Sequence, residues 1–283
     1  MYDSPMRRRL AELAGIALVL CAQAHAQPVD DAVVRVGTWN LKRLGHGDKR
    51  LDLVAAVIER FDVVALEEVM TPEGVDDLLA KLPGWKAAVS ERAVGSADYA
   101  EYYAVVYRES AVKLDRAFLT EDADDRFARE PFVTCFDAAK FDFCVVSIHV
   151  TYGKRVGPRD AEIRELGALV TSLRAGGDEK DWVIVGDFNR PGSARSWRAL
   201  HDQGWVFAFG DGKTPTSLGK AKYGNPYDHI LVDRSVTGEW LGEAARVDIV
   251  KDVCRRRFAW CAKHVSDHAP VVARFATAGP DDD

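Results

Sequence analysis

Short apolar runs occur along most of this 283-residue chain, separated by segments in which apolar residues recur every three or four positions. The runs are rich in valine, isoleucine and aromatic side chains, which is typical of strands buried in a sheet. We expect strands at residues 33–39, 63–66, 104–107, 132–136, 143–150, 182–185, 230–232 and 271–275. Several of these runs end beside a polar residue, and those positions carry most of the candidate chemistry.

Helical spacing occupies four segments between the strands. We expect helices within residues 51–58, 75–82, 163–173 and 197–200, where apolar residues share one helical face. Strands and helices mixed through one chain, with a hairpin in the middle, indicate packed sheets covered by helices. No repeat or low-complexity tract divides the chain, which favours one large domain.

Polar residues stand at the ends of the expected strands, from the first strand to the last. They occur in Trp39-Asn40, Leu66-Glu67-Glu68, Ile148-His149, Gly186-Asp187-Phe188-Asn189, Tyr227-Asp228-His229-Ile230 and Ser266-Asp267-His268. Carboxylates, amides and histidines at the ends of buried strands are the groups that a metal-assisted phosphodiester hydrolase needs. No single fragment is specific, but the whole ordered set is hard to obtain by chance.

This ordered set resembles the endonuclease/exonuclease/phosphatase superfamily, and within it the deoxyribonuclease I type. The resemblance extends over residues 33–275 and includes Tyr99-Ala-Glu101-Tyr-Tyr103 and Phe127-Ala-Arg129-Glu130-Pro131. It implies an α/β fold, a four-layer α/β sandwich in which two facing mixed β-sheets are flanked by helices and the active residues gather at one end. It also implies a metal-dependent endonuclease that hydrolyses DNA to 5′-phosphate products.

Two histidines are the candidate proton-transfer groups. The resemblance implies that Glu101 orients His149 and that Asp228 orients His268. A carboxylate fixes the tautomer of an imidazole and stabilises its protonated form. An isolated strand histidine is more often structural, but two histidines with two matching carboxylates reverse that expectation. Which histidine is the acid and which is the base is not decided by the residues.

Asp187 and Asn189 are two residues apart, so an extended backbone would point both side chains to one face. We expect them to present a carboxylate for metal or water and an amide donor for the phosphate. The alternative is a tight turn after the strand at 182–185, because Gly, Asp and Asn favour turns. Both interpretations can hold at once.

Metal binding is expected from oxygen ligands. Glu68 is a hard ligand that suits Mg²⁺, and the resemblance makes it the principal metal carboxylate, with Asn40 and Asp267 close by. Mn²⁺ is an alternative ion for this site, and a structural Ca²⁺ is left open. Taken singly, Glu68 could be a solvated strand-end carboxylate and Asn40 a turn residue.

Substrate contacts are implied by the resemblance for Arg129, Tyr99 and Tyr227. Arginine binds phosphate through paired hydrogen bonds, and tyrosine can pack on sugars. Lys154 and Arg155 follow His149 but are left out of the expected site, because a charged loop is usually only solvated.

Three residues depart from the family pattern. Glu67 stands where glutamine is frequent and is expected to add negative charge beside the metal site. Met70 replaces an arginine that reads the minor groove, and His229 replaces an arginine that usually follows the aspartate. Met70 weakens the assignment to double-stranded DNA more than it weakens the chemistry.

The N-terminus has the pattern of a secretory signal. Arg7-Arg8-Arg9 precedes a short apolar core at residues 10–20, and Ala24-His25-Ala26 is a small-residue cleavage site. We therefore expect a signal peptide at 1–26 and export to the periplasm or beyond the cell. The apolar run is too short for a membrane span, and the alternative is an N-terminal helix of the folded domain.

The folded domain is expected over residues 27–276, followed by a disordered acidic tail at 277–283. The formal net charge of the whole chain is −6, which argues against broad affinity for nucleic acid but allows a local basic face. We expect a monomer without stable membrane association whose partner is a nucleic acid substrate, DNA.

Four cysteines follow the expected leader: Cys135, Cys144, Cys254 and Cys261. Three pairings are possible, and an exported protein favours disulfides. The first two flank a hairpin that turns at residues 137–140, and the last two bracket an arginine-rich loop, so two local bridges are predicted. A zinc site is not expected, because no closely spaced cysteine pair accompanies a suitable histidine.

The sequence therefore predicts an exported, Mg²⁺-dependent endonuclease. One alternative keeps the fold and changes the substrate to sphingomyelin or inositol phosphates. A lipid enzyme should carry an exposed aromatic or apolar hairpin, and the sequence shows no clear one. A second alternative is a catalytically silent binding protein, although no position of the ordered set is degraded.

Overall fold

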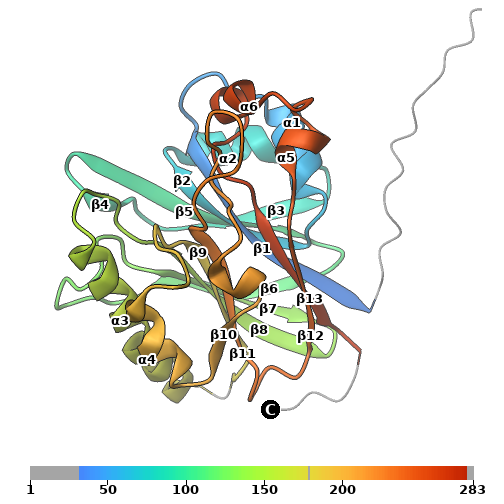
Figure 1. The fold of residues 1–283 in the computed structure, drawn as a ribbon. Coiled ribbons are helices and arrows are strands. Elements are labelled where there is room, and N and C mark those ends of the chain that lie inside the picture. Colours follow the sequence, from blue (N-terminus) through green and yellow to red (C-terminus); the bar gives the residue numbers. More distant parts are fainter. Residues whose placement is uncertain (1–31, 178, 279–283) are drawn as a thin grey trace, which may run out of the picture. The chain divides into compact units, whose positions relative to one another are not determined.

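Two β-sheets face each other and helices cover the outer face of each, which makes four layers (Figure 1). The computed structural model describes residues 32–177 and 179–278. The expected signal peptide at 1–26 and residues 279–283 of the expected tail lie outside this described part. The predicted α/β sandwich with two facing mixed sheets is confirmed.

The first sheet has seven strands in the order β12-β13-β1-β2-β5-β3, with β4 paired to β5. These are β1 (Val33–Leu44), β2 (Val63–Val69), β3 (Trp85–Val89), β4 (Val94–Ser96), β5 (Tyr99–Arg108), β12 (Trp240–Arg246) and β13 (Val271–Ala276). Strands β1 and β2 run parallel and the other pairs run antiparallel.

The second sheet has six strands in the order β10-β11-β9-β8-β7-β6. These are β6 (Lys113–Leu119), β7 (Phe132–Ala138), β8 (Phe141–His149), β9 (Trp182–Asp187), β10 (Trp205–Phe207) and β11 (Asp228–Asp233). Only the pair β8–β9 is parallel among these described strands, and α3 forms the crossover between the two.

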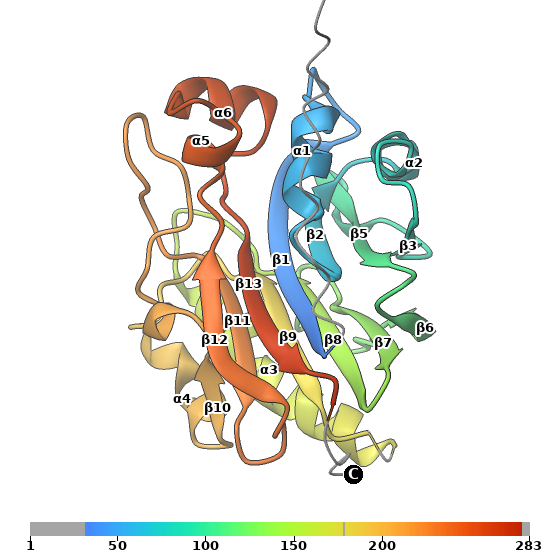
Figure 2. The same ribbon diagram turned by 90° about the vertical axis from the view of Figure 1, so that its right-hand side faces the viewer.

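The helices divide between the two outer faces (Figure 2). The first sheet is covered by α1 (Leu51–Ile58), α2 (Pro72–Leu79), α5 (Ile249–Asp252) and α6 (Phe258–His264), and the second by α3 (Gly157–Ala175) and α4 (Arg198–His201). The expected helix at 197–200 is a 3-10 turn, Arg195–Trp197, continued by the short α4. No helix in the described part of the chain is long and apolar enough to cross a membrane.

An aromatic cluster fills one part of the layer between the sheets. Phe141 of β8 stacks on Phe143, with ring centroids 4.5 Å apart, and on Phe275 of β13, at 5.2 Å. Phe136 of β7 contacts Phe143 and also Tyr107 of β5, at 5.7 and 5.3 Å. Because Phe275 and Tyr107 belong to the opposite sheet, these rings hold the two sheets together.

The inward-facing positions of several strands change from apolar to polar along the strand. In β8, Phe143 and Val145 are followed on the same face by His149, as the two-residue alternation of a strand requires. The strand register then aligns the polar positions, because His149 pairs with Asp187 and Asp187 pairs with Asp228. In the other sheet Asn40 pairs with Glu67 in the same way. One end of the inter-sheet layer is therefore polar.

The strands missing from the sequence analysis lie mainly at the sheet edges. Strands β3, β6, β10 and β12 are the outermost strands of the two sheets, and β4 pairs only with β5. Much of β6 and β12 is exposed, so neither carries an apolar run. Their pairing rests on backbone hydrogen bonds with a buried neighbour, which leave little trace in side-chain pattern.

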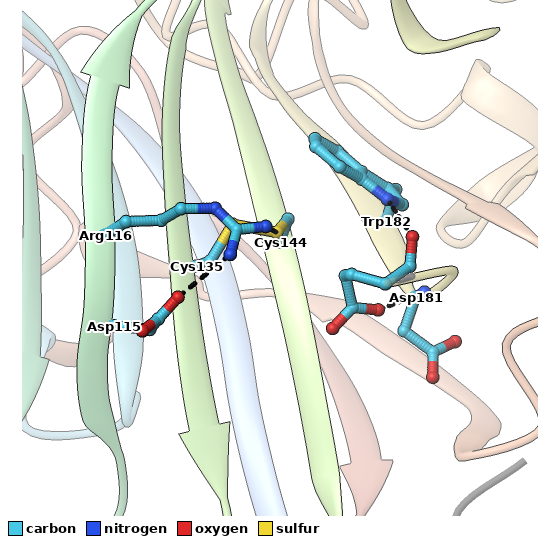
Figure 3. Close-up of a disulfide and its surroundings, with 7 residues drawn as sticks. Asp115, Arg116, Cys135, Cys144, Asp181 and Trp182 are labelled. Atoms are coloured by element: carbon cyan, nitrogen blue, oxygen red, sulfur yellow. Dashed lines mark hydrogen bonds and ion pairs between the residues drawn. A yellow bond between two sulfur atoms is a disulfide. The ribbon is translucent and has the colours of Figure 1, made fainter. Parts of the chain in front are cut away.

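Both predicted disulfides are present: Cys135–Cys144 and Cys254–Cys261. The first joins β7 to β8 and faces the α3 side of the sheet. Figure 3 shows Arg116 beside it, with a guanidinium nitrogen 3.8 Å from Sγ of Cys144. This bridge ties the hairpin that leads to His149, whereas the second ties the segment between α5 and α6.

Candidate active site

The predicted site residues come together around one pocket of about 660 Å³. Those that line it are Glu68, Tyr99, Arg129, His149, Asp187, Asn189, Tyr227, Asp267 and His268. Asn40, Glu101 and Asp228 lie behind this lining and are buried, and each hydrogen-bonds to a lining residue. The pocket therefore collects residues from both sheets at the polar end of the inter-sheet layer.

His149 is held by β5 and by its own backbone. Its Nδ1 lies 2.7 Å from Oε1 of the fully buried Glu101. Its N–H donates to Oη of Tyr103 at 2.8 Å, and its carbonyl accepts from Nη1 of Arg129 at 3.1 Å. These contacts leave Nε2 facing the pocket, where a proton can be exchanged.

His268 is held by Asp228 of β11 and by residues of β1. Its Nδ1 lies 2.8 Å from Oδ2 and 3.0 Å from Oδ1 of Asp228. Its N–H donates to Oγ of Ser266, whose hydroxyl donates to the carbonyl of Asn40 at 2.6 Å, and Trp39 donates its indole N–H to the His268 carbonyl. Residues of β1 therefore fix the segment that carries His268.

Asp187 lies between the two imidazoles. Its Oδ2 is 3.8 Å from Nε2 of His149 and 3.7 Å from Nε2 of His268. Gly186 allows this approach, because a Cβ built there would lie 1.8 Å from the Ile148 carbonyl oxygen of β8. The two ring nitrogens that are not bonded to a carboxylate partner thus converge on one carboxylate oxygen.

The expectation of an extended backbone from Asp187 to Asn189 is wrong. Strand β9 ends at Asp187, and Asn189 has a φ of 51°, so a turn follows the strand. The Asn189 N–H donates to Oδ1 of Asp187, and its side-chain amide donates to the Val150 carbonyl at 2.9 Å. The turn alternative describes the backbone, although Asn189 still lines the pocket.

The buried charges shift the proton equilibria of the pocket. Burial lowers the pKa of His149, but Glu101 and Asp187 outweigh it and leave the pKa raised. Burial likewise lowers the pKa of His268, yet Asp228 and Asp187 raise it well above its usual range. Burial raises the pKa of Asp187, and His268 only partly offsets this. The paired carboxylates therefore favour imidazolium over neutral imidazole.

The oxygen donors expected for a metal lie at one side of the pocket. Nδ2 of Asn40 donates to Oε1 of Glu68 at 3.0 Å and to Oδ2 of Asp187 at 3.1 Å. Lys42 forms an ion pair with Asp267 at 2.9 Å. A set of hard oxygens that line a pocket, with a lysine that already balances part of their charge, fits a hard divalent cation.

A second group of possible ligands is better explained as a histidine–carboxylate pair. Ligand atoms of Asp187, Asp228 and His268 lie within 4.8 Å of one another. Both oxygens of Asp228, however, lie within hydrogen-bond distance of Nδ1 of His268. The geometry of this group is therefore that of an imidazole oriented by a carboxylate.

Burial opposes the negative charge that the sequence analysis expected at Glu67. Its side chain is fully buried and accepts a hydrogen bond from Thr38 Oγ1 at 2.7 Å. Burial, joined by the nearby carboxylates Asp228 and Asp187, raises its pKa well above the usual range. A protonated glutamic acid is close in shape and hydrogen bonding to the glutamine it replaces.

The three expected substrate residues differ in their burial and in their contacts with the rest of the protein. Arg129 is buried, donates to the His149 carbonyl, lies 3.6 Å from Glu101 through Nε, and stacks over the Tyr99 ring at 5.1 Å. One guanidinium nitrogen, Nη1, is therefore hydrogen-bonded to the protein, and Arg129 still lines the pocket. Tyr99 and Tyr227 line the pocket with part of their surfaces exposed.

His229 takes no part in the pocket. It faces the helical side of β11, where its ring contacts Phe188, Trp197 and Phe207. Burial lowers its pKa to about 4, so the ring is neutral and its Nε2 hydrogen-bonds to the Arg190 carbonyl.

Sequence reasoning missed residues that act behind the pocket. Tyr103, Ser266 and Lys42 each contact an expected site residue, and Arg159 and Glu162 of α3 hold the backbone near it. The available signal was position: Tyr103 is two residues from Glu101 on one strand face, and Ser266 precedes Asp267. For Arg159 and Glu162 no local pattern distinguished these buried charges from solvated ones.

Comparison with known proteins gives a consistent assignment. A model of the Endonuclease/Exonuclease/phosphatase family matches residues 37–268. A deoxyribonuclease of Thioalkalivibrio sp. (strain K90mix) is 33% identical over 266 residues, covering 86% of this chain and 71% of that protein. Deoxyribonuclease gamma of Rattus norvegicus is 28% identical over 225 residues, covering 70% of each chain.

Solved structures share the same fold at low sequence identity. D. rerio TDP2, solved with a single-strand DNA product, has a TM-score of 0.65 at 15% identity, over 86% of this chain and 98% of that chain. The mannosyl-6-phosphatase of Bacteroides thetaiotaomicron has a TM-score of 0.59 at 18% identity, over 85% and 98%. These similarities concern the arrangement of the sheets and helices.

Proposed function

Because this chain belongs to the endonuclease/exonuclease/phosphatase family, we propose that it is a metal-dependent endonuclease that hydrolyses the phosphodiester bonds of DNA. Two relatives that it resembles over most of its length bear the name deoxyribonuclease. The observation that carries the proposal is the convergence of two imidazole Nε2 atoms on Asp187, at 3.8 and 3.7 Å. Each imidazole is oriented from behind by its own buried carboxylate.

This geometry suits in-line hydrolysis of a phosphodiester. One Nε2 takes a proton from the attacking water, and the other gives a proton to the leaving oxygen. The new bond joins the water oxygen to phosphorus, and the bond from phosphorus to the 3′ oxygen breaks, which leaves a 5′-phosphate. Glu101 and Asp228 stabilise the imidazolium form, which one ring adopts on taking the proton of water and the other ring leaves on protonating the 3′ oxygen. Asp187 holds the two rings and the water in one place.

Glu68 and Asp267 would hold the metal, for which Mg²⁺ is the proposed ion and Mn²⁺ an alternative. The oxygen of Asn40 accepts the backbone N–H of Lys42, so in this arrangement Asn40 would orient Glu68 through its amide N–H. When bound, the ion neutralises charge that develops on the phosphoryl oxygens. Asn40 connects this side of the pocket to the acid–base side, because its amide donates to both Glu68 and Asp187. Loss of Asn40 should therefore disturb both functions.

We also propose that the protein is exported and monomeric. The two disulfides support an oxidising compartment, in agreement with the signal peptide that the sequence predicts at 1–26. The DNA strand would reach the pocket from its open side, where Tyr99 and Tyr227 are partly exposed.

A parallel substrate assay tests the function. The purified protein is incubated with plasmid DNA, RNA, sphingomyelin and inositol phosphates, with Mg²⁺ and with EDTA. We expect EDTA-sensitive nicking of plasmid DNA and products with a 5′-phosphate. His149→Gln, which retains a hydrogen-bond donor for Glu101, serves as the inactive control. Preferential hydrolysis of sphingomyelin or an inositol phosphate would replace this proposal with the corresponding lipid or phosphatase activity, and no hydrolysis at all would favour a binding protein.

A further inference from the structure

The connection between β8 and α3 presents an aromatic ring beside the catalytic pocket. Tyr152 is 73% exposed, more than the other large apolar side chains that protrude from the described part of the chain, Val156 and Leu241. Tyr152 also lines the pocket that contains His149 and Asp187. A single exposed aromatic side chain is common on protein surfaces, but one that also lines a polar pocket is placed to contact a ligand there.

The backbone that carries Tyr152 is fixed from the helix behind it. The buried Arg159 of α3 donates to the Gly153 carbonyl at 2.8 Å and to the Asn189 carbonyl at 2.9 Å. Its guanidinium carbon also lies 5.7 Å from the centre of the Tyr152 ring. Because the ring is supported on one side, a ligand that stacks on it loses little freedom of the loop.

Arg159 also links this loop to the candidate site. It bonds to the backbone of both Gly153 and Asn189, which stand on two separate connections that line the pocket. Glu162, one turn further along α3, accepts the N–H of Thr151 at 3.3 Å. The position of the Tyr152 ring relative to His149 is thus determined by two buried side chains of α3.

Positive charge follows the ring along the same loop. Lys154 and Arg155 are exposed, and neither has an ion-pair partner within residues 32–177 and 179–278. A π-face next to free cations is the combination that binds a single nucleic acid strand, because bases stack on the ring while cations contact phosphates. Val156, 46% exposed, lies four residues further along the same connection, so vesicle binding is the alternative outcome that the test includes, whereas Tyr152 itself lines the pocket.

We propose that Tyr152 is a nucleobase-binding subsite, on which a base next to the scissile phosphate stacks while Lys154 and Arg155 contact the neighbouring phosphates. This inference rests on the proposed nuclease function. A base can reach the ring only after it leaves its own stack, so the subsite favours single-stranded or locally unpaired DNA over intact duplex.

The test compares Tyr152→Ala with two matched variants. Tyr152→Phe keeps the ring, and Leu241→Ala removes an exposed apolar side chain from the distant strand β12. On a single-stranded oligonucleotide we expect Tyr152→Ala to lower kcat/KM by about 5- to 150-fold, the loss typical of one base-stacking contact. Tyr152→Phe and Leu241→Ala should match the parent, and the loss on intact duplex should be smaller.

Substrates without bases separate stacking from a structural role. Parent and Tyr152→Ala should cleave an oligomer that lacks every base at the same rate. A series of oligonucleotides then carries one abasic residue at successive positions. At one position the missing base should lower kcat/KM of the parent as much as Tyr152→Ala does. The same abasic position should lower kcat/KM of Tyr152→Ala no further. An equal loss on the baseless oligomer, or no loss on the normal one, would overturn the subsite.

Two further measurements distinguish the nucleobase subsite from membrane binding and from DNA binding without cleavage. Sedimentation with vesicles of phosphatidylcholine and phosphatidylserine asks whether the loop docks on a lipid surface. Vesicle binding that depends on Tyr152, with unchanged cleavage of DNA, would refute the nucleobase subsite. Oligonucleotide affinity is also measured in the His149→Gln background with and without Tyr152→Ala. If the parent binds DNA through Tyr152 but never cleaves it, the hydrolytic proposal fails and the subsite stands.

Discussion

The two ends of the layer between the sheets are built on the same strands. One end stabilises the fold, and the other carries the candidate active site. At one end, Phe141, Phe143 and Phe275 stack against one another and exclude water. At the other end, the same inward face of β8 presents His149, and β9 presents Asp187. The apolar end gains stability from burial, whereas the polar end keeps buried charges that folding alone would not favour.

The difference shows how a rigid site can be supported. Each histidine of the polar end is bonded to a buried carboxylate, His149 to Glu101 and His268 to Asp228. The cost of burying these charges is offset by their pairing and by the apolar packing a few residues away on the same strands. We therefore expect mutations at the two ends to separate activity from stability.

The largest effect on activity should come from the histidines. His149→Gln and His268→Gln each remove proton transfer while retaining a donor for the paired carboxylate, so kcat should fall about 10²–10⁴-fold. The double variant should be little worse than the poorer single variant, because the two rings share one task. Plasmid nicking by folded protein at saturating Mg²⁺ measures this. Parental rates for both single variants would show that the mechanism is wrong.

A loss of stability without a loss of activity is expected at Phe143, six residues before His149 on the same strand face. Phe143→Ala opens a cavity among stacked rings, and the free energy of unfolding should fall by about 3–5 kcal/mol. The rate per folded molecule, assayed below the melting transition, should remain that of the parent. Denaturation in urea and an active-site titration measure the two quantities. A large loss of turnover in fully folded protein would mean that the two ends are not independent.

Adjacent residues sharpen the comparison within the polar end. Glu68→Gln removes a charge that would bind the metal, and the Mg²⁺ affinity should fall about 10- to 100-fold. Glu67→Gln replaces a buried acid whose raised pKa keeps it protonated, and the amide oxygen of the new side chain can still accept the bond from Thr38. The activity of this second variant should stay near the parental value. Mg²⁺ titrations of both variants test this contrast, and equal losses would contradict it.

The last prediction concerns the effect of pH on stability through Glu162. Burial raises the pKa of this carboxyl to about 7 from an ordinary value of 4.5. Since the folded protein keeps a proton that the unfolded chain releases, the stabilising contribution is complete below pH 4.5 and is lost as the pH rises toward 7. Between these values the parental free energy of unfolding should fall by about 1.4 kcal/mol per pH unit relative to Glu162→Gln. Urea denaturation from pH 4 to pH 8 measures the difference, and parallel curves would contradict it.

The sequence predicted the buried strands better than the edges. Runs such as those in β2 and β9 are apolar on both faces because a sheet and a layer of helices enclose them. Edge strands β6 and β12 have one free side and mostly exposed side chains, so their alternation is weak. The ordered polar set survived as a signal because its members lie near one end of a buried strand, just before it or just after it.

The residues of the site, the family and the local disulfides were thus determined by the sequence itself, because each depends on short-range pattern or on order along the chain. Other properties depended on tertiary contacts. The pKa of Glu67 is raised because distant strands bury its carboxyl group, and Arg129 is fixed in place because Glu101 and the His149 carbonyl lie beside it. Tyr152 lies at the rim of the pocket, and the guanidinium carbon of Arg159 lies 5.7 Å from the centre of its ring. Burial and charge act through space, so the electrostatic state of a group is decided by neighbours that its own sequence context does not contain.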